Sequence, residues 1–309
     1  MTDSRIQNFR VAIVILSLNQ RDKTLKCLES LLETALSSTD IFVWDNGSND
    51  GTAEAVQKQF PMVITRRHPH NLGVASGRNA AAKLANEMIA PTHLLFLDND
   101  MTVEAGFVDE LLRPFQSDTE NRIGQCQAKL RLMHDPQRLN DGGGCKIQFW
   151  LGRTSPIGYG EIDRGQYDKV KSCVACGGAM MVRSDVFNEM GGFDTCFDPF
   201  GPEDLDFSIR LQKAGYEALY VPKAVAYHEV SQTFGEGEYT EEYAEYRSRH
   251  WFTFMRRHAN FLQKLSFVLI GVPIIASRIL IREGNKGNIS AIKGLLRGLF
   301  APRKKNDTD

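Results

Sequence analysis

The 309-residue sequence lacks the motifs that most often mark a phosphate-binding loop. No G-x-G-x-x-G follows the first apolar run, and no G-x-x-x-x-G-K-[ST] occurs, which argues against a dinucleotide fold and a P-loop. Six cysteines are too few for a secreted disulfide scaffold and favour a reducing cytosol. Cys173 and Cys176 have the spacing of half a zinc finger, but no second Cys/His pair follows at finger spacing, so zinc is disfavoured. The polar stretch 1–10 predicts no signal peptide.

An excess of charge of one sign is also missing, because the net charge is only −1. That balance hides an asymmetry: residues 1–242 carry 24 Lys and Arg against 34 Asp and Glu, whereas residues 243–309 carry 13 against 4. An acidic body disfavours nucleic acid as a partner. A basic tail interleaved with apolar residues favours an anionic membrane surface. The sequence therefore predicts two parts, a main domain over 1–242 and a basic, helical, membrane-associating tail over 243–309.

Three short apolar runs predict buried strands over 11–16, 41–44 and 94–97. Helical patterns separate them, and such β-α-β alternation predicts an α/β fold with a mostly parallel, Rossmann-like central sheet and helices on both faces. In such sheets ligands bind at the carboxyl ends of the strands. Asp45 and Asp98 each follow an apolar run directly, so both are expected at that edge.

The middle of the chain differs from the first part in composition and in periodicity. Residues 131–170 are rich in Gly, Asp, Arg and aromatic residues with weak periodicity, and we interpret them as a variable, substrate-facing region of unassigned structure. Regular patterns then return, with a strand predicted over 179–182, a helix capped by Ser184, and a helix from Pro202 to Gly215.

The sharpest local motif is Asp98-Asn99-Asp100. Two carboxylates at a strand end can coordinate a hard cation such as Mg²⁺ or Mn²⁺ through oxygen. That cation can bridge a diphosphate and neutralise the charge that develops as it leaves. The alternative is a turn whose aspartates cap the next helix, and by itself the motif does not decide between the two.

A second acidic motif, Glu203-Asp204, opens the helix after Pro202. Ordinary capping explains one acid there, but three acids in four residues exceed what capping requires. A carboxylate at this position can accept the proton of an acceptor hydroxyl as a general base. His228, which follows an apolar run, is a further candidate metal ligand, although a lone histidine of this kind is more often structural.

Together these motifs resemble the family 2 glycosyltransferases, and in particular their rhamnosyltransferase-like branch. The resemblance covers about residues 10–235 and implies an inverting enzyme with the GT-A fold. It rests on an ordered series of motifs rather than on any one of them: Val11–Asn19, Trp44-Asp45-Asn46-Gly47-Ser48, Asn71-Leu72-Gly73, Asp98-Asn99-Asp100, Gly177-Gly178-Ala179, Gly191-Gly192-Phe193-Asp194, Glu203-Asp204 and His228.

The resemblance implies a nucleotide-sugar donor and assigns residues to it. Ser17, Asn19 and Asp45 would bind the nucleotide base and ribose. Asn71 and Arg78 would lie beside the nucleotide. The acceptor would be a saccharide or a lipid-linked glycan, as in the synthesis of cell-surface polysaccharide or glycolipid.

The resemblance also implies a metal ion. Asp98 and Asp100 would hold Mg²⁺ or Mn²⁺ on the diphosphate, with His228 as an additional candidate ligand. Asn99 stands where many members of the family have another acid, and it is expected beside the donor together with Asp98.

The implied reaction is a single in-line displacement. Asp204 would deprotonate the acceptor hydroxyl, with Glu203 beside it in contact with donor or acceptor sugar. The nucleoside diphosphate would leave from the opposite face.

The basic tail contains a 17-residue apolar stretch, 265–281, interrupted by two serines, a proline and an arginine. A clean spanning helix needs about 20 apolar residues, so this stretch favours a helix lying on an anionic inner leaflet. We therefore expect a cytoplasmic protein peripherally associated with the membrane. A spanning or re-entrant segment and a soluble oligomerisation helix remain alternatives.

Two rival functions are consistent with parts of the sequence. A nucleotidyltransferase acting on sugar phosphates shares the architecture and a metal-held diphosphate, but it should carry a basic, Gly-rich loop in place of Ser17-Leu18-Asn19-Gln20. A non-catalytic sugar-binding protein would not need the acidic pair Glu203-Asp204.

Overall fold

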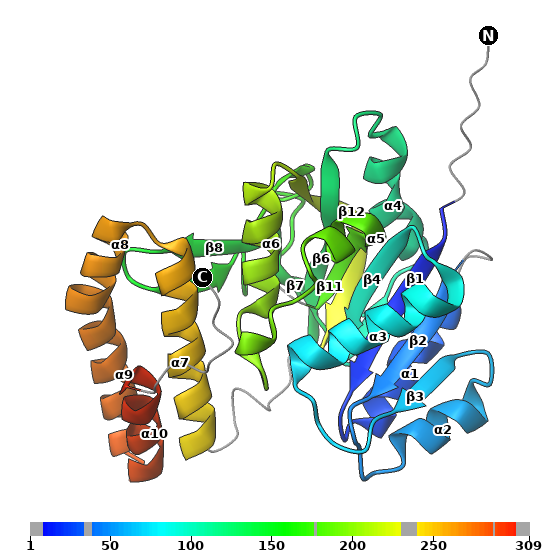
Figure 1. Cartoon of the computed structure of the whole chain (residues 1–309). Helices are drawn as coiled ribbons and strands as arrows, with labels where there is room; N and C mark the ends of the chain where they lie inside the picture. Colours follow the sequence, from blue (N-terminus) through cyan, green and yellow to red (C-terminus); the bar gives the residue numbers. More distant parts are fainter. Residues whose placement is uncertain (1–8, 34–38, 176–177, 230–239, 287, 301–309) are drawn as a thin grey trace.

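The computed structural model describes residues 9–33, 39–175, 178–229, 240–286 and 288–300 (Figure 1). The strands are β1 (Val11–Ser17), β2 (Thr39–Asp45), β3 (Ile64–Arg67), β4 (His93–Asp98), β5 (Met101–Val103), β6 (Ile123–Leu132), β7 (Asp135–Asp141), β8 (Cys145–Gln148), β9 (Arg153–Pro156), β10 (Lys171–Ser172), β11 (Ala179–Arg183) and β12 (Glu217–His228). The helices are α1 (Arg21–Leu32), α2 (Thr52–Gln59), α3 (Val74–Ile89), α4 (Phe107–Ser117), α5 (Ser184–Glu189), η1 (Thr195–Phe197), α6 (Glu203–Lys213), α7 (Glu241–His258), α8 (Phe261–Ser266), η3 (Phe267–Gly271), α9 (Val272–Gly284) and α10 (Ile289–Phe300).

The central sheet confirms the predicted α/β class. Its strands run in the order β10-β12-β6-β11-β4-β1-β2-β3, with β5 beside β12 and β7 beside β6. The four strands from β3 to β4 are parallel, as the alternating pattern predicts, and β12 is parallel to β6. Strand β11 is antiparallel to both β4 and β6, so the sheet is mixed beyond the first βα units.

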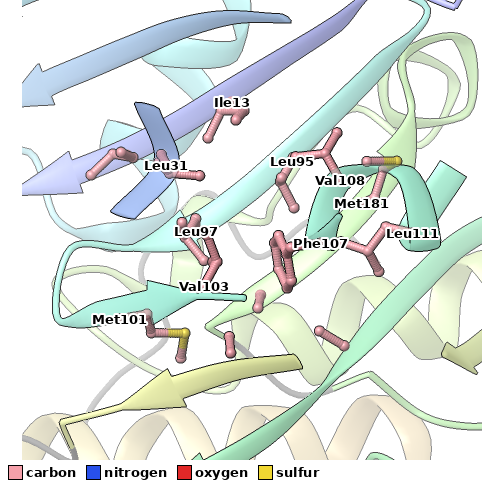
Figure 2. Packing of buried hydrophobic residues seen from close by; sticks show 14 of the residues in the cluster. Ile13, Leu31, Leu95, Leu97, Met101, Val103, Phe107, Val108, Leu111 and Met181 are labelled. Atoms are coloured by element: carbon pink, nitrogen blue, oxygen red, sulfur yellow. The ribbon is translucent and has the colours of Figure 1, made fainter. Parts of the chain in front are cut away.

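Helices cover both faces of the sheet (Figure 1). Strand β1 shows why: Val11, Ile13 and Ile15 join one hydrophobic cluster, while Ala12 and Val14 join the other. Both sets are almost fully buried, as a strand covered on both faces requires. Figure 2 shows the first cluster, in which side chains of β1, β4 and α4 pack together.

The segment 131–170, which has no clear periodicity, folds as strands β7, β8 and β9 with connecting turns. Strand β7 pairs with β6, and β8 pairs with β9 as a separate hairpin. Buried Lys129 on β6 forms ion pairs with Asp163, at 2.9 Å, and with Asp168. Long-range pairing of this kind, rather than local periodicity, determines the structure of the segment.

Local boundaries differ slightly from the sequence predictions. Helix α6 begins at Glu203, with Pro202 as its N-cap rather than in its first turn. Helix α5 begins at Ser184, which was predicted as its cap. Cys176 of the cysteine pair and Gly177 of the Gly-Gly-Ala motif lie outside the described residues.

The C-terminal helices stand at the end of the molecule opposite β3 and α2 (Figure 1). The expected boundary at 242 falls at the start of α7, and α7 packs against the body through a cluster that includes Phe197, Leu205 and Phe254. Helix α10 lies against α7, and Gly298 approaches Ser248 closely. The tail is therefore helical, as predicted, and its first helix shares a hydrophobic core with the body.

Candidate active site

The strand ends bring several of the predicted residues to one edge of the sheet. In the parallel register Ser17 of β1 faces Asp45 of β2, and Leu16 faces Asp98 of β4. Because the carboxyl ends of parallel strands share an edge, these polar residues gather where ligands bind in open α/β sheets.

The end of β2 forms a rigid polar loop. Asp45 is buried, and its Oδ1 accepts a hydrogen bond from the backbone N–H of Ser48 at 2.7 Å. Its Oδ2 is buried without a hydrogen bond in the described part of the chain, although Arg67 lies 3.9 Å away. A buried carboxylate oxygen of this kind normally has a donor, which makes Oδ2 a ready acceptor for a ligand. Asn19 supports the loop by accepting from the N–H of Asn49 at 2.7 Å.

The side chains of Ser17 and Asn99 are buried and form hydrogen bonds with each other and with Thr24. Ser17 Oγ lies 2.8 Å from the hydroxyl of Thr24, and the Asn99 amide donates to Thr24 at 3.0 Å and to Ser17 at 3.3 Å. An amide at the middle position of the D-x-D motif thus ties this turn to β1 and α1. Both residues support the turn that carries Asp98 and Asp100. Direct contact of either residue with the donor stays a prediction.

Asn71 belongs to the turn that leads into α3. Its Oδ1 accepts from the Asn46 amide at 2.7 Å and from the N–H of Gly73 at 2.9 Å. Gly73 has φ +95, and a Cβ there would lie 2.3 Å from Asp198, so the close approach of this turn requires glycine. Asp198 caps α3 by accepting from the N–H of Ala75 at 2.9 Å.

Arg78 connects the two acidic motifs. Its buried guanidinium donates from Nη2 to Asp98 at 2.5 Å and from Nη1 to Glu203 at 3.2 Å. Arg78 lies on α3, Asp98 ends β4 and Glu203 begins α6. One side chain therefore fixes the strand end against the first turn of α6, although the two acids are far apart in sequence.

Asp98, Asp100 and His228 form the candidate metal centre. One ligand atom from each lies within 4.8 Å of the others. His228 Nε2 is 3.4 Å from Asp100 Oδ1, and burial, which lowers the pKa of His228, is outweighed by the hydrogen bond and charge of Asp100, which raise it. Two carboxylates and an imidazole suit a divalent cation such as Mn²⁺ or Mg²⁺.

The backbone around this trio is tightly constrained. The N–H of Asp98 donates to the carbonyl of Gly178 at 2.7 Å, and the N–H of Glu229 donates to that of Asp100 at 2.9 Å. Gly178 has φ +79, and a Cβ there would lie 2.2 Å from the Met101 side chain. The described glycine of the Gly-Gly-Ala motif is therefore favoured mainly by its positive φ, a backbone conformation that other residues rarely adopt.

The two acids that begin α6 differ in environment. Glu203 is buried and accepts from Arg78 through one oxygen and from the N–H of Gly201, at 3.2 Å, through the other. Asp204 is half-buried, and its Oδ1 accepts from the N–H of Leu205 at 2.7 Å. Burial raises the pKa of both carboxyl groups; the Asp204 charge raises that of Glu203 further, and Arg78 opposes the shift in each. A carboxylate with a raised pKa is the stronger base.

The third acid of this helix, Asp206, has a different role. It is fully buried and accepts from Arg210 at 2.7 Å and from Arg257 and His258 at 2.8 Å each. These partners hold its pKa down to about 2, against desolvation by burial. Arg257 and His258 end α7, so the tail's first helix is bonded to the helix that carries the candidate base.

Sequence reasoning missed Asp198, Arg257 and His258. Asp198 is 123 residues from Ala75, and His258 is 52 residues from Asp206. No local pattern signals contacts of this range. The one available signal was the third acid of the Glu203–Asp206 run, because a buried carboxylate needs cationic partners.

Comparison with known proteins decides the family. Residues 12–191 match the family described as "Glycosyl transferase family 2", and residues 163–279 match "Glycosyl transferase family group 2". The chain belongs to the family 2 glycosyltransferases. This glycosyltransferase is 25% identical over 276 residues to the N-acetylglucosaminyl-diphospho-decaprenol L-rhamnosyltransferase of Mycobacterium tuberculosis, a match covering 83% of this chain and 88% of the relative. The predicted resemblance to the rhamnosyltransferase-like branch is thereby confirmed.

Other relatives of this glycosyltransferase agree on family and fold. An uncharacterized glycosyltransferase of Bacillus subtilis is 30% identical over 247 residues, covering 67% of this chain and 61% of the relative. A mannosyltransferase of Pyrobaculum calidifontis, solved with GDP-Man and Mn²⁺, superposes with a TM-score of 0.57 at 15% identity, covering 95% of this chain and 88% of that one. GalNAc-T7, solved with UDP, GalNAc and Mn²⁺, gives 0.59 at 15% identity, covering 71% of this chain and 44% of that one. The GT-A fold predicted from sequence is confirmed.

Proposed function

We propose that this glycosyltransferase is an inverting, divalent-metal-dependent enzyme that moves a sugar from a nucleoside-diphosphate-sugar to a hydroxyl of a saccharide or lipid-linked glycan. The observation that carries the proposal is the bridge made by Arg78, which joins Asp98 of the D-x-D turn to Glu203. The bridge supports a single site in which the candidate metal ligand Asp98 lies near the helix start that carries Glu203 and the candidate base Asp204. A diphosphate and an acceptor hydroxyl would both be engaged there.

The donor would lie along the carboxyl edge of the sheet. The buried Oδ2 of Asp45, which accepts no hydrogen bond from the described residues, supports binding of the nucleoside, and Asn19, Ser17 and Asn71 shape the loops around it. Asp98, Asp100 and His228 would hold Mg²⁺ or Mn²⁺, and two structural relatives were solved with Mn²⁺. A cation bound there would neutralise charge on the leaving diphosphate.

Asp204 is proposed as the general base. It is more exposed than Glu203, whose two oxygens are both bonded, and its raised pKa suits proton abstraction. Asp204 would take the acceptor hydroxyl proton while the hydroxyl oxygen bonds to the anomeric carbon. The bond from that carbon to the phosphate oxygen would break, and its electron pair would leave with the nucleoside diphosphate. Attack opposite the leaving group inverts the configuration.

The tail supports a membrane-bound acceptor. Residues 261–284 form one 24-residue helical segment that is long and apolar enough to cross a membrane; its most apolar 18-residue stretch has a mean hydropathy of 1.9, and only 11% of that stretch is buried. Its inner side contacts the rest of the molecule near the start of the segment: Ser266 donates to the carbonyl of Trp150 in the body at 2.9 Å, and Phe267 packs on Phe252 of α7. Attachment of this first part of the segment to the body favours a helix that lies on the membrane surface over one that crosses it.

The outer side of the segment is apolar and flanked by basic residues. Its large exposed side chains are Phe261, Leu262, Leu265, Val268, Leu269, Ile270, Leu280 and Ile281. Lys264, Arg278 and Arg282 lie in the same segment and suit anionic headgroups. We place the enzyme in the cytoplasm on the inner face of the membrane, with 243–309 as its attachment.

A donor screen tests the proposal. Thermal unfolding of the full chain is measured with a panel of nucleotide-sugars, with Mn²⁺ and with EDTA, because a ligand that binds the native state raises apparent stability. The stabilising donor is then incubated with glycan and polyprenyl-linked acceptors. Metal-dependent release of nucleoside diphosphate with an inverted product supports the proposal; release of pyrophosphate indicates a nucleotidyltransferase, and binding without turnover a sugar-binding protein.

A further inference from the structure

The imidazole of His228 has an oxygen atom close to each of its two nitrogens. Nδ1 lies 3.0 Å from Oδ1 of Asn140, and Nε2 lies 3.4 Å from Oδ1 of Asp100. Asn140 comes from β7, inside the region whose structure the sequence does not indicate. An amide oxygen only accepts hydrogen bonds, so this contact requires the proton of the ring to be on Nδ1.

A proton on Nδ1 determines what the other nitrogen offers. In the neutral ring the lone pair is then on Nε2, which faces the carboxylates of Asp100 and Asp98. One nitrogen of the ring and one carboxylate oxygen from each aspartate lie within 4.8 Å of one another, a spacing at which all three can coordinate one cation. Histidines that ligate metals almost always donate their second ring N–H to a carboxylate, carbonyl or water, which fixes the tautomer and the ring orientation.

We propose that Asn140 is a positioning residue that holds His228 as the Nδ1-protonated tautomer, so that Nε2 is presented with Asp98 and Asp100 to a divalent cation. The inference rests on the metal role given to this trio in the proposed function. It adds a residue outside every motif of the family resemblance.

The sheet gives Asn140 the rigidity that this role needs. Strand β6 lies between β7 and β12: Leu130 pairs with Asp141, and Leu132 pairs with His228. The Asn140 residue is 9% exposed. On either side, the N–H of Leu139 donates to the carbonyl of Glu161 at 2.9 Å, and Asp141 accepts from two backbone N–H groups. The backbone positions of Asn140 and His228 are therefore both fixed by pairing with strand β6.

Two substitutions of similar size separate positioning from packing. Asn140→Leu removes the acceptor, whereas Asn140→Asp retains an oxygen that can only accept. Mn²⁺ is titrated into each full-length protein, alone and with UDP or GDP, and the dissociation constant is measured by calorimetry or electron paramagnetic resonance. We expect about 10- to 100-fold weaker binding in Asn140→Leu. Asn140→Asp should bind at least as tightly as the wild type, because its carboxylate keeps the acceptor and also attracts the cation.

A second readout needs no metal. The ¹⁵N shifts of the His228 ring, assigned by comparison with His228→Gln, report which nitrogen carries the proton. Recorded at a pH above the raised pKa of His228, where the ring is neutral, they should show the proton on Nδ1 in the wild type and in Asn140→Asp, and not in Asn140→Leu. A wild-type ring protonated on Nε2 alone overturns the proposal even if Asn140→Leu does not fold.

The control is Asn86→Leu, which removes another asparagine side-chain bond, 3.2 Å to Asn188, from an exposed site on α3. It should leave Mn²⁺ affinity unchanged. Equal Mn²⁺ affinity of wild type and Asn140→Leu overturns the positioning role and leaves the metal centre standing. A wild type that binds no Mn²⁺ with or without nucleotide overturns the metal centre itself, and the positioning role with it.

Discussion

Arg78 of helix α3 donates a hydrogen bond of 2.5 Å to Asp98, the last residue of strand β4. The same guanidinium reaches Glu203 with its other arm. Because both partners are acidic and buried or half-buried, the arginine keeps two negatively charged turns together that would otherwise repel each other. The site therefore depends on a residue that was expected only to lie beside the nucleotide, and that contact remains a prediction.

Replacing this arginine by lysine tests the bridge. Lysine keeps the charge but offers a single point donor, so Arg78→Lys can satisfy only one of the two acids. We expect a fall in kcat of roughly 100-fold, as for a misplacement of about 1 Å at a catalytic centre. Arg113→Lys, at an exposed ion pair with Glu110, is the matched control and should be neutral. Unchanged kcat in Arg78→Lys would show that the bridge is not needed for turnover.

Asp204→Asn removes the proposed base while keeping the shape of the side chain. We expect transfer to be reduced by at least about 100-fold, within the range by which a general base accelerates a reaction. Donor affinity, measured by calorimetry, should stay close to that of the wild type. Asp22→Asn, at an exposed acid in the first turn of α1, controls for loss of a helix-start carboxylate. Full activity in Asp204→Asn would exclude Asp204 as the base.

The raised pKa of Asp204 predicts a pH dependence with a definite sign. The base must be ionised to act, so kcat/KM should fall as pH is lowered, with its acid limb above the ordinary range of an aspartate. Because folding raises this pKa, the ionised group destabilises the native state at neutral pH, and Asp204→Asn should unfold at a higher temperature than the wild type. A profile that is flat down to the ordinary aspartate range would contradict the assignment.

Asp206 predicts the opposite linkage. Its folded pKa is depressed to about 2, so its stabilising contribution is complete above the ordinary aspartate pKa and is lost as pH falls through about 2. Asp206→Asn should cost about 3–5 kcal/mol of unfolding free energy at neutral pH, because Arg257 and Arg210 lose a buried partner. Urea unfolding over a pH series should show the gap between variant and wild type closing toward acid. A gap independent of pH would rule out this account.

The exposed face of 261–284 predicts membrane binding through particular side chains. Leu269 and Ile281 are each 65% exposed, and fully burying such a side chain contributes about 1.5–3 kcal/mol. The double substitution Leu269→Glu/Ile281→Glu in the full chain should lower sedimentation with anionic vesicles by at least about 10-fold and leave turnover of a soluble acceptor unchanged. Met62→Glu/Met88→Glu, at exposed sites on the body, is the control. Resistance of the wild type to alkaline carbonate would indicate a spanning segment instead.

The fold class, the family and the sheet edge that carries the candidate site could all be predicted from local features of the sequence. Buried strands with continuous apolar residues, such as 11–16 and 94–97, carry a local signal, and the residue after each strand is placed by that signal alone. The D-x-D turn and the Glu203-Asp204 turn could be named for the same reason.

The contacts that hold those turns in place could not be predicted from local sequence and follow from the assembled fold. The bridge from Arg78 to Glu203, the cap from Asp198 to α3, the hydrogen bond from His228 to Asn140 and the bonds from α7 to Asp206 all join residues distant in sequence. Local periodicity records which face of an element is buried, and carries no information about which distant polar group satisfies a buried charge. That pairing is selected only when the sheet and helices are assembled, because an unpaired buried charge is too costly to remain.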